Sequence, residues 1–204
     1  MTARPPRPPA LTNGQRTQVL GVATTAIERA LIGADAVPPE PSDYDPPLRE
    51  PAATFVTLER DRRLLGCIGT LEAHRPLVAS VAHNALAAAF SDPRLPPVTT
   101  DDYEAMTVTV SYLSALEPMD VSNRDALAAA ACPGRDGLVL EIGPRQATLL
   151  PSVWEQVPAT DEFLDLLWNK AGLRSREWPT GIRVLCYVTD VFGDTGPRAS
   201  VSSS

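Results

Sequence analysis

The stretch MTVTVSYL, residues 106–113, decides the fold, because apolar and polar side chains alternate along it without interruption. Met106, Val108, Val110 and Tyr112 fall on one face of an extended chain, and the threonines and the serine between them fall on the other. Strict alternation is typical of a strand in an antiparallel sheet with one buried face. The sequence therefore predicts a half-buried strand here.

On both sides of this strand, the apolar residues recur either at every second position, as in a strand, or at helical spacing. The predicted strands come in pairs and triplets with helices between them, and they do not follow a strict βαβ alternation. We expect strands at residues 54–58, 64–71, 138–142, 146–150 and 182–191, and helices at residues 13–32, 76–90, 100–104, 123–132 and 160–171. The pattern predicts an α+β fold, a single compact domain with a largely antiparallel sheet packed with several helices. An arrangement in two subdomains with a cleft stays open.

The two ends of the chain differ in composition from its middle. Residues 1–11 are rich in proline and arginine, and residues 193–204 end in a serine-rich run, so we expect a disordered arm and a disordered tail. Residues 12–192 then form the folded domain. Inside it, residues 37–51 contain six prolines, and we expect an irregular surface segment there.

Composition excludes several classes of protein. The 204 residues carry a formal net charge of −7, whereas nucleic-acid binders usually have a basic footprint, so we expect no nucleic-acid partner. No apolar run approaches the ~20 residues that cross a bilayer, so we expect no membrane partner and no secretory signal at the N-terminus. Three widely spaced cysteines favour a reducing, cytoplasmic location.

Eight short segments occur in an order that resembles the AMMECR domain family, which includes bacterial proteins labelled AmmeMemoRadiSam system protein A. The segments are TFVTL (54–58), LGCIGTL (65–71), AAFSDPR (88–94), VTVSYLS (108–114), DGL (136–138), LLP (149–151), EFL (162–164) and KAGL (170–173). The family motif usually carries an arginine where this chain has Leu65, so the family's role for that charge is not transferred.

The resemblance implies a function only in outline, because the family has no securely assigned reaction. Its name reflects association with Memo-like proteins and radical-SAM proteins, which are the partners that the resemblance implies. We therefore expect an accessory enzyme or a substrate-binding component of a radical-SAM-linked modification pathway, with a cleft around the Gly-Cys-Ile-Gly motif. The alternative is a non-catalytic adaptor that docks a partner protein.

Cys67 is the strongest candidate for a reactive side chain. It lies on a predicted strand between Gly66 and Gly69, and glycine in a strand often marks the close approach of a ligand or of another backbone. A thiol beside such open backbone is a candidate nucleophile. The structural alternative is that Cys67 packs as a small hydrophobe and that the glycines only relieve crowding.

A nucleophilic cysteine needs a partner that favours the thiolate, and His83 is a candidate base. It lies about two turns into the helix that follows the motif, with Asn84 next to it. Neighbours on a helix point about 100° apart, so His83 and Asn84 cannot easily converge on one thiol. His83 is more often a residue of the helix's polar face.

A small anionic ligand is a second hypothesis. His74 and Arg75 precede the helix that begins near Pro76, where free N–H groups and the helix dipole favour anions, and Arg94 could add a bidentate donor. The alternative is that Arg75 is solvated and that Arg94 pairs with Asp92.

Motifs for metals and cofactors are missing from the sequence. It contains no C-x-x-C pair, no H-E-x-x-H and no phosphate-binding loop. We therefore expect neither a metal site nor a cofactor.

Overall fold

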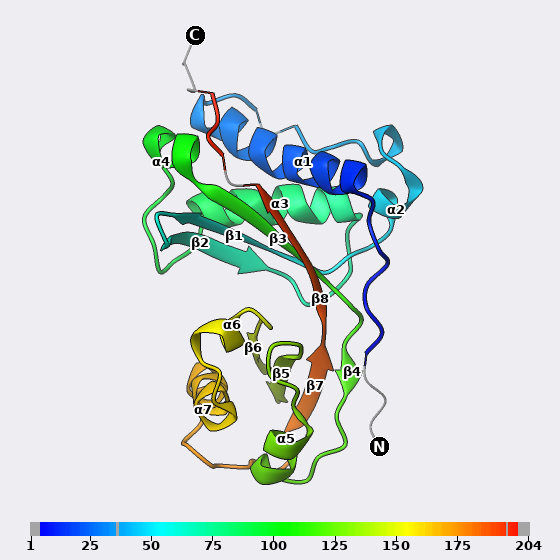
Figure 1. Ribbon diagram of the computed structural model, residues 1–204, viewed down its shortest axis with the longest axis vertical. Helices are drawn as coiled ribbons and strands as arrows, with labels where there is room; N and C mark the ends of the chain where they lie inside the picture. The colour runs from blue at the N-terminus through cyan, green and yellow to red at the C-terminus, as the bar shows by residue number, and fades with distance from the viewer. Residues whose placement is uncertain (1–4, 36, 195, 200–204) are drawn as a thin grey trace. The chain divides into compact units, whose positions relative to one another are not determined.

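Residues 107–113 of the stretch quoted above form strand β3 of a four-stranded sheet. The strand order in this sheet is β2-β1-β3-β8 (Figure 1). The computed structural model describes residues 5–35, 37–194 and 196–199. The central strand β1 pairs antiparallel with β2 and with β3. The bounds are β1 Thr54–Arg60, β2 Arg63–Gly69, β3 Thr107–Leu113 and β8 Thr189–Asp194. The predicted half-buried strand is confirmed, because the apolar face of β3 is buried.

A second four-stranded sheet has the order β4-β7-β5-β6, and its paired strands are antiparallel. Its strands are β4 Glu117–Pro118, β5 Gly137–Ile142, β6 Arg145–Leu149 and β7 Arg183–Tyr187. The helices of the described chain are α1 Asn13–Leu31, the 3₁₀ helix η1 Pro41–Asp43, α2 Pro46–Arg49, α3 Leu77–Phe90, α4 Thr100–Ala105, α5 Arg124–Ala130, α6 Val153–Gln156 and α7 Thr160–Lys170. An α+β fold with largely antiparallel sheets is therefore confirmed.

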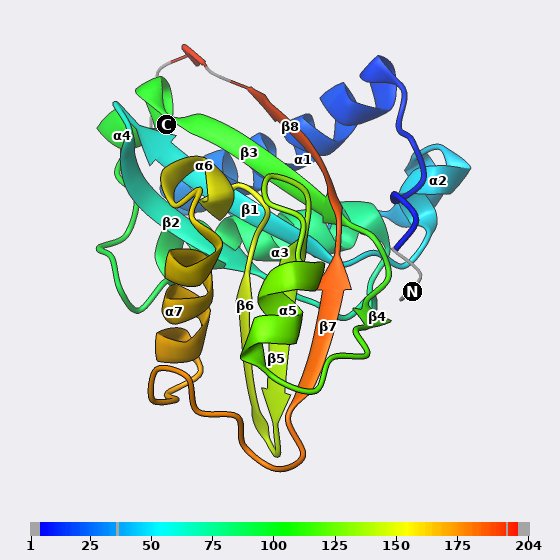
Figure 2. The ribbon, with the colours of Figure 1, turned by 60° about the horizontal axis from the view of Figure 1, so that its bottom comes forward.

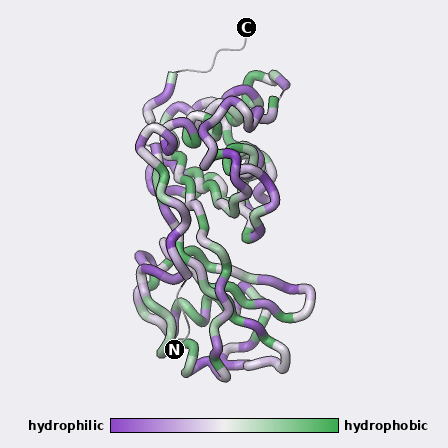
Figure 3. Tube along the Cα trace, turned by 90° about the vertical axis from the view of Figure 1, so that its right-hand side faces the viewer, coloured by the Kyte–Doolittle hydropathy of each residue, from purple (hydrophilic) through white to green (hydrophobic). Residues whose placement is uncertain are grey.

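Each sheet has its own hydrophobic core, and the chain divides into two units. The larger unit comprises Pro9–Leu113 and Asp190–Ser204, and the smaller unit comprises Met1–Pro8 and Ser114–Thr189. Apolar and polar residues alternate along the trace in both of them (Figure 3). This division corresponds to the two-subdomain arrangement that the sequence left open.

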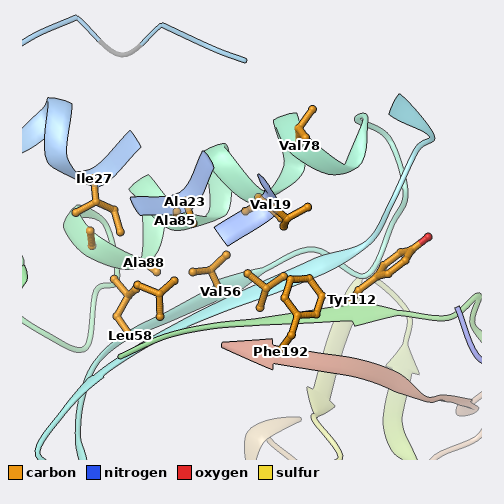
Figure 4. Close-up of a cluster of buried hydrophobic side chains, with 14 of the residues drawn as sticks. Val19, Ala23, Ile27, Val56, Leu58, Val78, Ala85, Ala88, Tyr112 and Phe192 are labelled. Carbon is orange, nitrogen blue, oxygen red and sulfur yellow. The ribbon is translucent and has the colours of Figure 1, made fainter. Parts of the chain in front are cut away.

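In the larger unit, α1 and α3 pack on one face of the sheet (Figure 4). Helix α1 begins where Thr12 and Gln15 form a reciprocal capping box, which satisfies two otherwise free N–H groups. Its buried stripe faces α3 and the sheet, where Val56 and Leu58 of β1 are fully buried. The sheet therefore has one face covered by helices.

In the smaller unit, the core forms between the sheet and the helices α5, α6 and α7 (Figure 2). The rings of Trp154 and Phe163 stack with centroids 3.7 Å apart, and both are buried. On β7, the hydroxyl group of Tyr187 lies 2.8 Å from the hydroxyl of Thr148 and donates to the carbonyl of Leu149. These contacts tie β7 to β6 across the sheet.

Two segments differ from the prediction. Residues 37–51 are not wholly irregular, because η1 and α2 form there with prolines in their first turns, where the missing N–H costs nothing. The predicted strand at 182–191 is two strands that belong to different sheets. The N–H of Val188 donates to the hydroxyl of Ser114 at 3.0 Å, so a side chain takes the place of a strand partner at the break.

The ordered chain also extends beyond the predicted domain limits. Leu11, which we expected in a disordered arm, is buried in the core of the larger unit. The tail predicted from residue 193 instead continues β8 through Asp194, and the side chain of Arg198 donates to the carbonyls of Tyr103 and Met106. Within these two predicted segments, residues 1–4, 195 and 200–204 fall outside the described residues.

Candidate functional site

Cys67 lies on β2, an edge strand, and its side chain is half-buried. Its partner on the neighbouring strand β1 is Thr57, and the Cys67 Sγ lies 3.3 Å from the Thr57 Oγ1. Because side chains alternate along a strand, Thr57 projects away from the face on which Val56 and Leu58 pack against the helices. The thiol therefore belongs to the sheet face that α1 and α3 leave uncovered.

The backbone of Cys67 is held by two side chains from the turn after α3. Asp92 Oδ2 accepts a hydrogen bond from the Cys67 N–H at 3.0 Å, and Arg94 Nη2 donates to the Cys67 carbonyl at 3.0 Å. An edge strand leaves these groups without a strand partner, so Asp92 and Arg94 supply the pairing that a further strand would give.

Asp92 and Arg94 also form an ion pair with each other, which was the alternative to a role of Arg94 in binding an anion. The Arg94 Nε donates to Asp92 Oδ1 at 2.8 Å and its Nη2 donates to Asp92 Oδ2 at 2.6 Å. The Asp92 side chain is only 2% exposed. Its pKa lies far below the ordinary value, chiefly because of the hydrogen bond from Arg94, which outweighs the opposing effect of burial.

The charge of Arg94 is fixed in turn. Its pKa is raised above the ordinary value, first by the hydrogen bond to Asp92, which outweighs the opposing effect of burial, and to a smaller degree by the electrostatic attraction of Asp92 and Cys67. Arg94 therefore keeps its charge while it holds the Cys67 carbonyl.

Packing accounts for both glycines of the motif. A Cβ on Gly66 would lie 1.9 Å from the Ala88 carbonyl oxygen of α3, and one on Gly69 would lie 2.2 Å from the Phe55 ring. Protein atoms therefore fill the space that a ligand would need at these two positions. Gly66 and Gly69 serve close packing of β2 against α3 and against β1.

His83 and Cys67 are not brought together. His83 is exposed on α3, and α3 packs on the sheet face opposite to the thiol. The neighbouring Asn84 is buried and donates to the Thr54 carbonyl at 3.0 Å and to its hydroxyl at 2.9 Å. Asn84 thus fixes α3 to β1 and does not orient His83.

The predicted anion site is not assembled from its three members either. His74 pairs with Glu72, and both side chains are exposed. Arg75 precedes α3, whereas Arg94 follows it, and a helix of 14 residues is about 21 Å long. Arg94 is therefore engaged at the opposite end of α3.

Arg75 and His83 both line a cavity that the sequence did not predict. It has a volume of about 490 Å³ and lies in the larger unit between α1, α3 and residues 37–44. Cys67 does not line it. The missed residues come from the outer side of α1 and from the proline-rich segment. One signal for them was visible, because Val22 and Ala26 are apolar yet lie beside the buried stripe of α1.

Within residues 5–35, 37–194 and 196–199, no three His, Cys, Asp or Glu side chains are grouped so as to hold a metal ion. None of the helices in that part of the chain combines the length and apolar character needed to span a bilayer.

Comparison with known proteins gives one consistent family. A model of the AMMECR1 family matches residues 20–192. A protein of Thermofilum pendens is 36% identical over 196 residues, covering 88% of this chain and 90% of that protein. A protein of Methanocaldococcus jannaschii is 32% identical, covering 94% and 96%. The crystal structure of an uncharacterized protein from Pyrococcus horikoshii superposes with a TM-score of 0.83 at 31% identity, covering 92% of this chain and 95% of that one.

Proposed function

Because the chain belongs to the AMMECR1 family, we propose that it is an accessory enzyme or substrate-binding component of a radical-SAM-linked modification pathway, in which Cys67 contacts the substrate. The pathway follows from the family resemblance. The role of Cys67 follows from the contacts of its backbone and its thiol.

One observation carries the assignment to Cys67. The Asp92–Arg94 pair holds both the N–H and the carbonyl of this residue, while the thiol itself is half-buried and contacts a threonine hydroxyl. Groups that act on a substrate must be held in place by their surroundings, and here the support is a charged pair with a nearly buried carboxylate.

The chemistry available is that of a thiol beside a fixed guanidinium. Arg94, whose side chain is more than half exposed, can attract the anionic group of a bound substrate, and Thr57 can donate or accept a hydrogen bond at the sulfur. Both functions suit a protein that holds a substrate for a partner enzyme.

The proposal is tested by isolating the tagged full-length protein from its own cells. Radical-SAM and Memo-like proteins should be identified by peptide mass spectrometry among the co-purifying proteins, and intact mass should show an adduct on Cys67. Cys67→Ser should remove the adduct, whereas Cys186→Ser is the matched control that keeps it. Partners retained equally by Cys67→Ser, with no adduct in the wild type, would identify a non-catalytic adaptor instead.

A further inference from the structure

The cavity in the larger unit is an elongated groove between two helices. Val19 lies towards Val78, and Ile27 lies towards Ala88, so α1 and α3 run in the same direction (Figure 4). The groove is lined along α1 from Gln18 to Arg29, which corresponds to about 16 Å of helix. It therefore extends along more than half of α1.

The proline-rich segment lies along this groove from one end to the other. Near its start, the Arg29 Nε of the last turn of α1 donates to the Asp35 carbonyl at 3.1 Å. Near its end, the Gln15 Nε2 of the first turn donates to Asp45 Oδ2 at 3.2 Å. The segment is thus tied to both ends of α1, and it contributes Tyr44 to the cavity wall.

The middle of the groove is apolar. Its walls come from aliphatic and proline side chains of all three elements, namely Val22, Ala26, Ala79, Ala82, Leu86, Val37, Pro38 and Pro39. A volume of about 490 Å³ is in the range of small-molecule sites, which are mostly apolar with a few polar groups that fix orientation.

The two ends carry different charge. Arg29 is half-buried, its Nε is fixed by Asp35, and within the described part of the chain no carboxylate pairs with its guanidinium. At the other end Arg75 is exposed, and the carboxylate of Asp43 also lines the cavity there. In a chain of net charge −7, the Arg29 end is thus a positively charged terminus of an apolar groove.

We propose that this groove binds a medium-chain fatty carboxylate. The aliphatic body lies along Val22, Ala82 and Leu86, and the carboxylate pairs with the Nη groups of Arg29, which hold no carboxylate within the described residues and recognise carboxylates bidentately. This site is separate from Cys67, which lies on the other face of the sheet.

The test uses calorimetry on the full chain with dodecanoate below its critical micelle concentration. We expect saturable one-to-one binding, and binding of the cationic dodecyltrimethylammonium that is weaker by about tenfold or more. Arg29→Ala should weaken dodecanoate binding by about tenfold, whereas Arg145→Ala, which removes an exposed arginine of the smaller unit, should leave it unchanged.

A blocking variant tests the location. Gly21 lines the cavity and a Cβ there meets nothing within 4 Å, so Gly21→Trp should fill the groove and abolish binding without disturbing α1. Gly14→Trp, on the first turn of the same helix and outside the cavity, is the control, and thermal unfolding should confirm that both variants fold. Absence of saturable binding, equal binding of the cationic probe, or full binding by Gly21→Trp would each overturn the proposal.

Discussion

Asp92 accepts a hydrogen bond from the backbone N–H of Cys67, 25 positions earlier in the chain, at 3.0 Å. The same carboxylate accepts hydrogen bonds from the guanidinium of Arg94, and this guanidinium also donates to the carbonyl of Cys67. The short turn that contains Asp92 and Arg94 thus provides hydrogen-bond partners for both the N–H and the carbonyl of Cys67 on the edge strand.

Replacing this carboxylate should change stability and its dependence on pH. Asp92→Asn should lower the free energy of unfolding at pH 7 by about 2 kcal/mol, because a charged acceptor of several hydrogen bonds is lost. The depressed pKa of Asp92 stabilises the fold above the ordinary value of 3.8, and this contribution is lost as the pH falls below it. Urea unfolding from pH 7 to pH 2 should therefore show a steeper acid decline for the wild type than for the variant. Parallel curves would contradict the assignment.

Gly66 should tolerate no side chain. Gly66→Ala should destabilise the larger unit by about 3 kcal/mol, since its Cβ would lie 1.9 Å from the Ala88 carbonyl oxygen and β2 or α3 would have to move. Gly21→Ala, in the open on α1, is the matched control and should stabilise by about 0.5–1 kcal/mol. Urea midpoints measure both, and a Gly66→Ala protein as stable as the wild type would exclude the close contact.

The three thiols should differ in their rate of alkylation. Burial is the main cause that raises the pKa of Cys186 to about 11, so little thiolate forms there at pH 8. Cys67 is half-buried and lies on the sheet face that α1 and α3 leave uncovered, so it should react first. Brief iodoacetamide treatment followed by peptide mass spectrometry gives the order, and faster labelling of Cys132 or Cys186 would refute it.

Arg198 should anchor the chain beyond β8. Its side chain is only 9% exposed, pairs with Asp194 at 2.8 Å, and donates to carbonyls at the end of α4. Arg198→Ala should lower the free energy of unfolding by about 2 kcal/mol because buried acceptors lose their charged donor. Arg145→Ala is the control, and equal thermal midpoints for the two variants would show that the contact has no energetic role.

Local patterns predicted the elements that local interactions determine. The capping residue Thr12 and the alternation along β3 are examples, since caps and side-chain periodicity depend on residues close in sequence. The break between β7 and β8 could not be predicted, because the alternation continues through Val188 and only the distant Ser114 interrupts the ladder.

The candidate site shows the same limit. Cys67 was correctly placed on a strand beside glycines, and the pairing of Arg94 with Asp92 was foreseen as an alternative. The hydrogen bonds from this pair to the Cys67 backbone depend on where α3 ends relative to β2. This is a tertiary relationship, which local sequence patterns do not contain. The groove was missed for a related reason, because it requires α1, α3 and the proline-rich segment to meet.

The hydrogen bonds between Ser114 and Val188 also mark where the sheet of the larger unit is interrupted along the chain. They join the points where the chain leaves the larger unit and returns to it, so residues 115–187 are an insertion in the position of a hairpin loop. Translation delivers β8 only after that insertion is complete. The larger unit, most of which is made first, therefore completes its sheet last, in contrast to the usual N-terminal-first folding of successive domains.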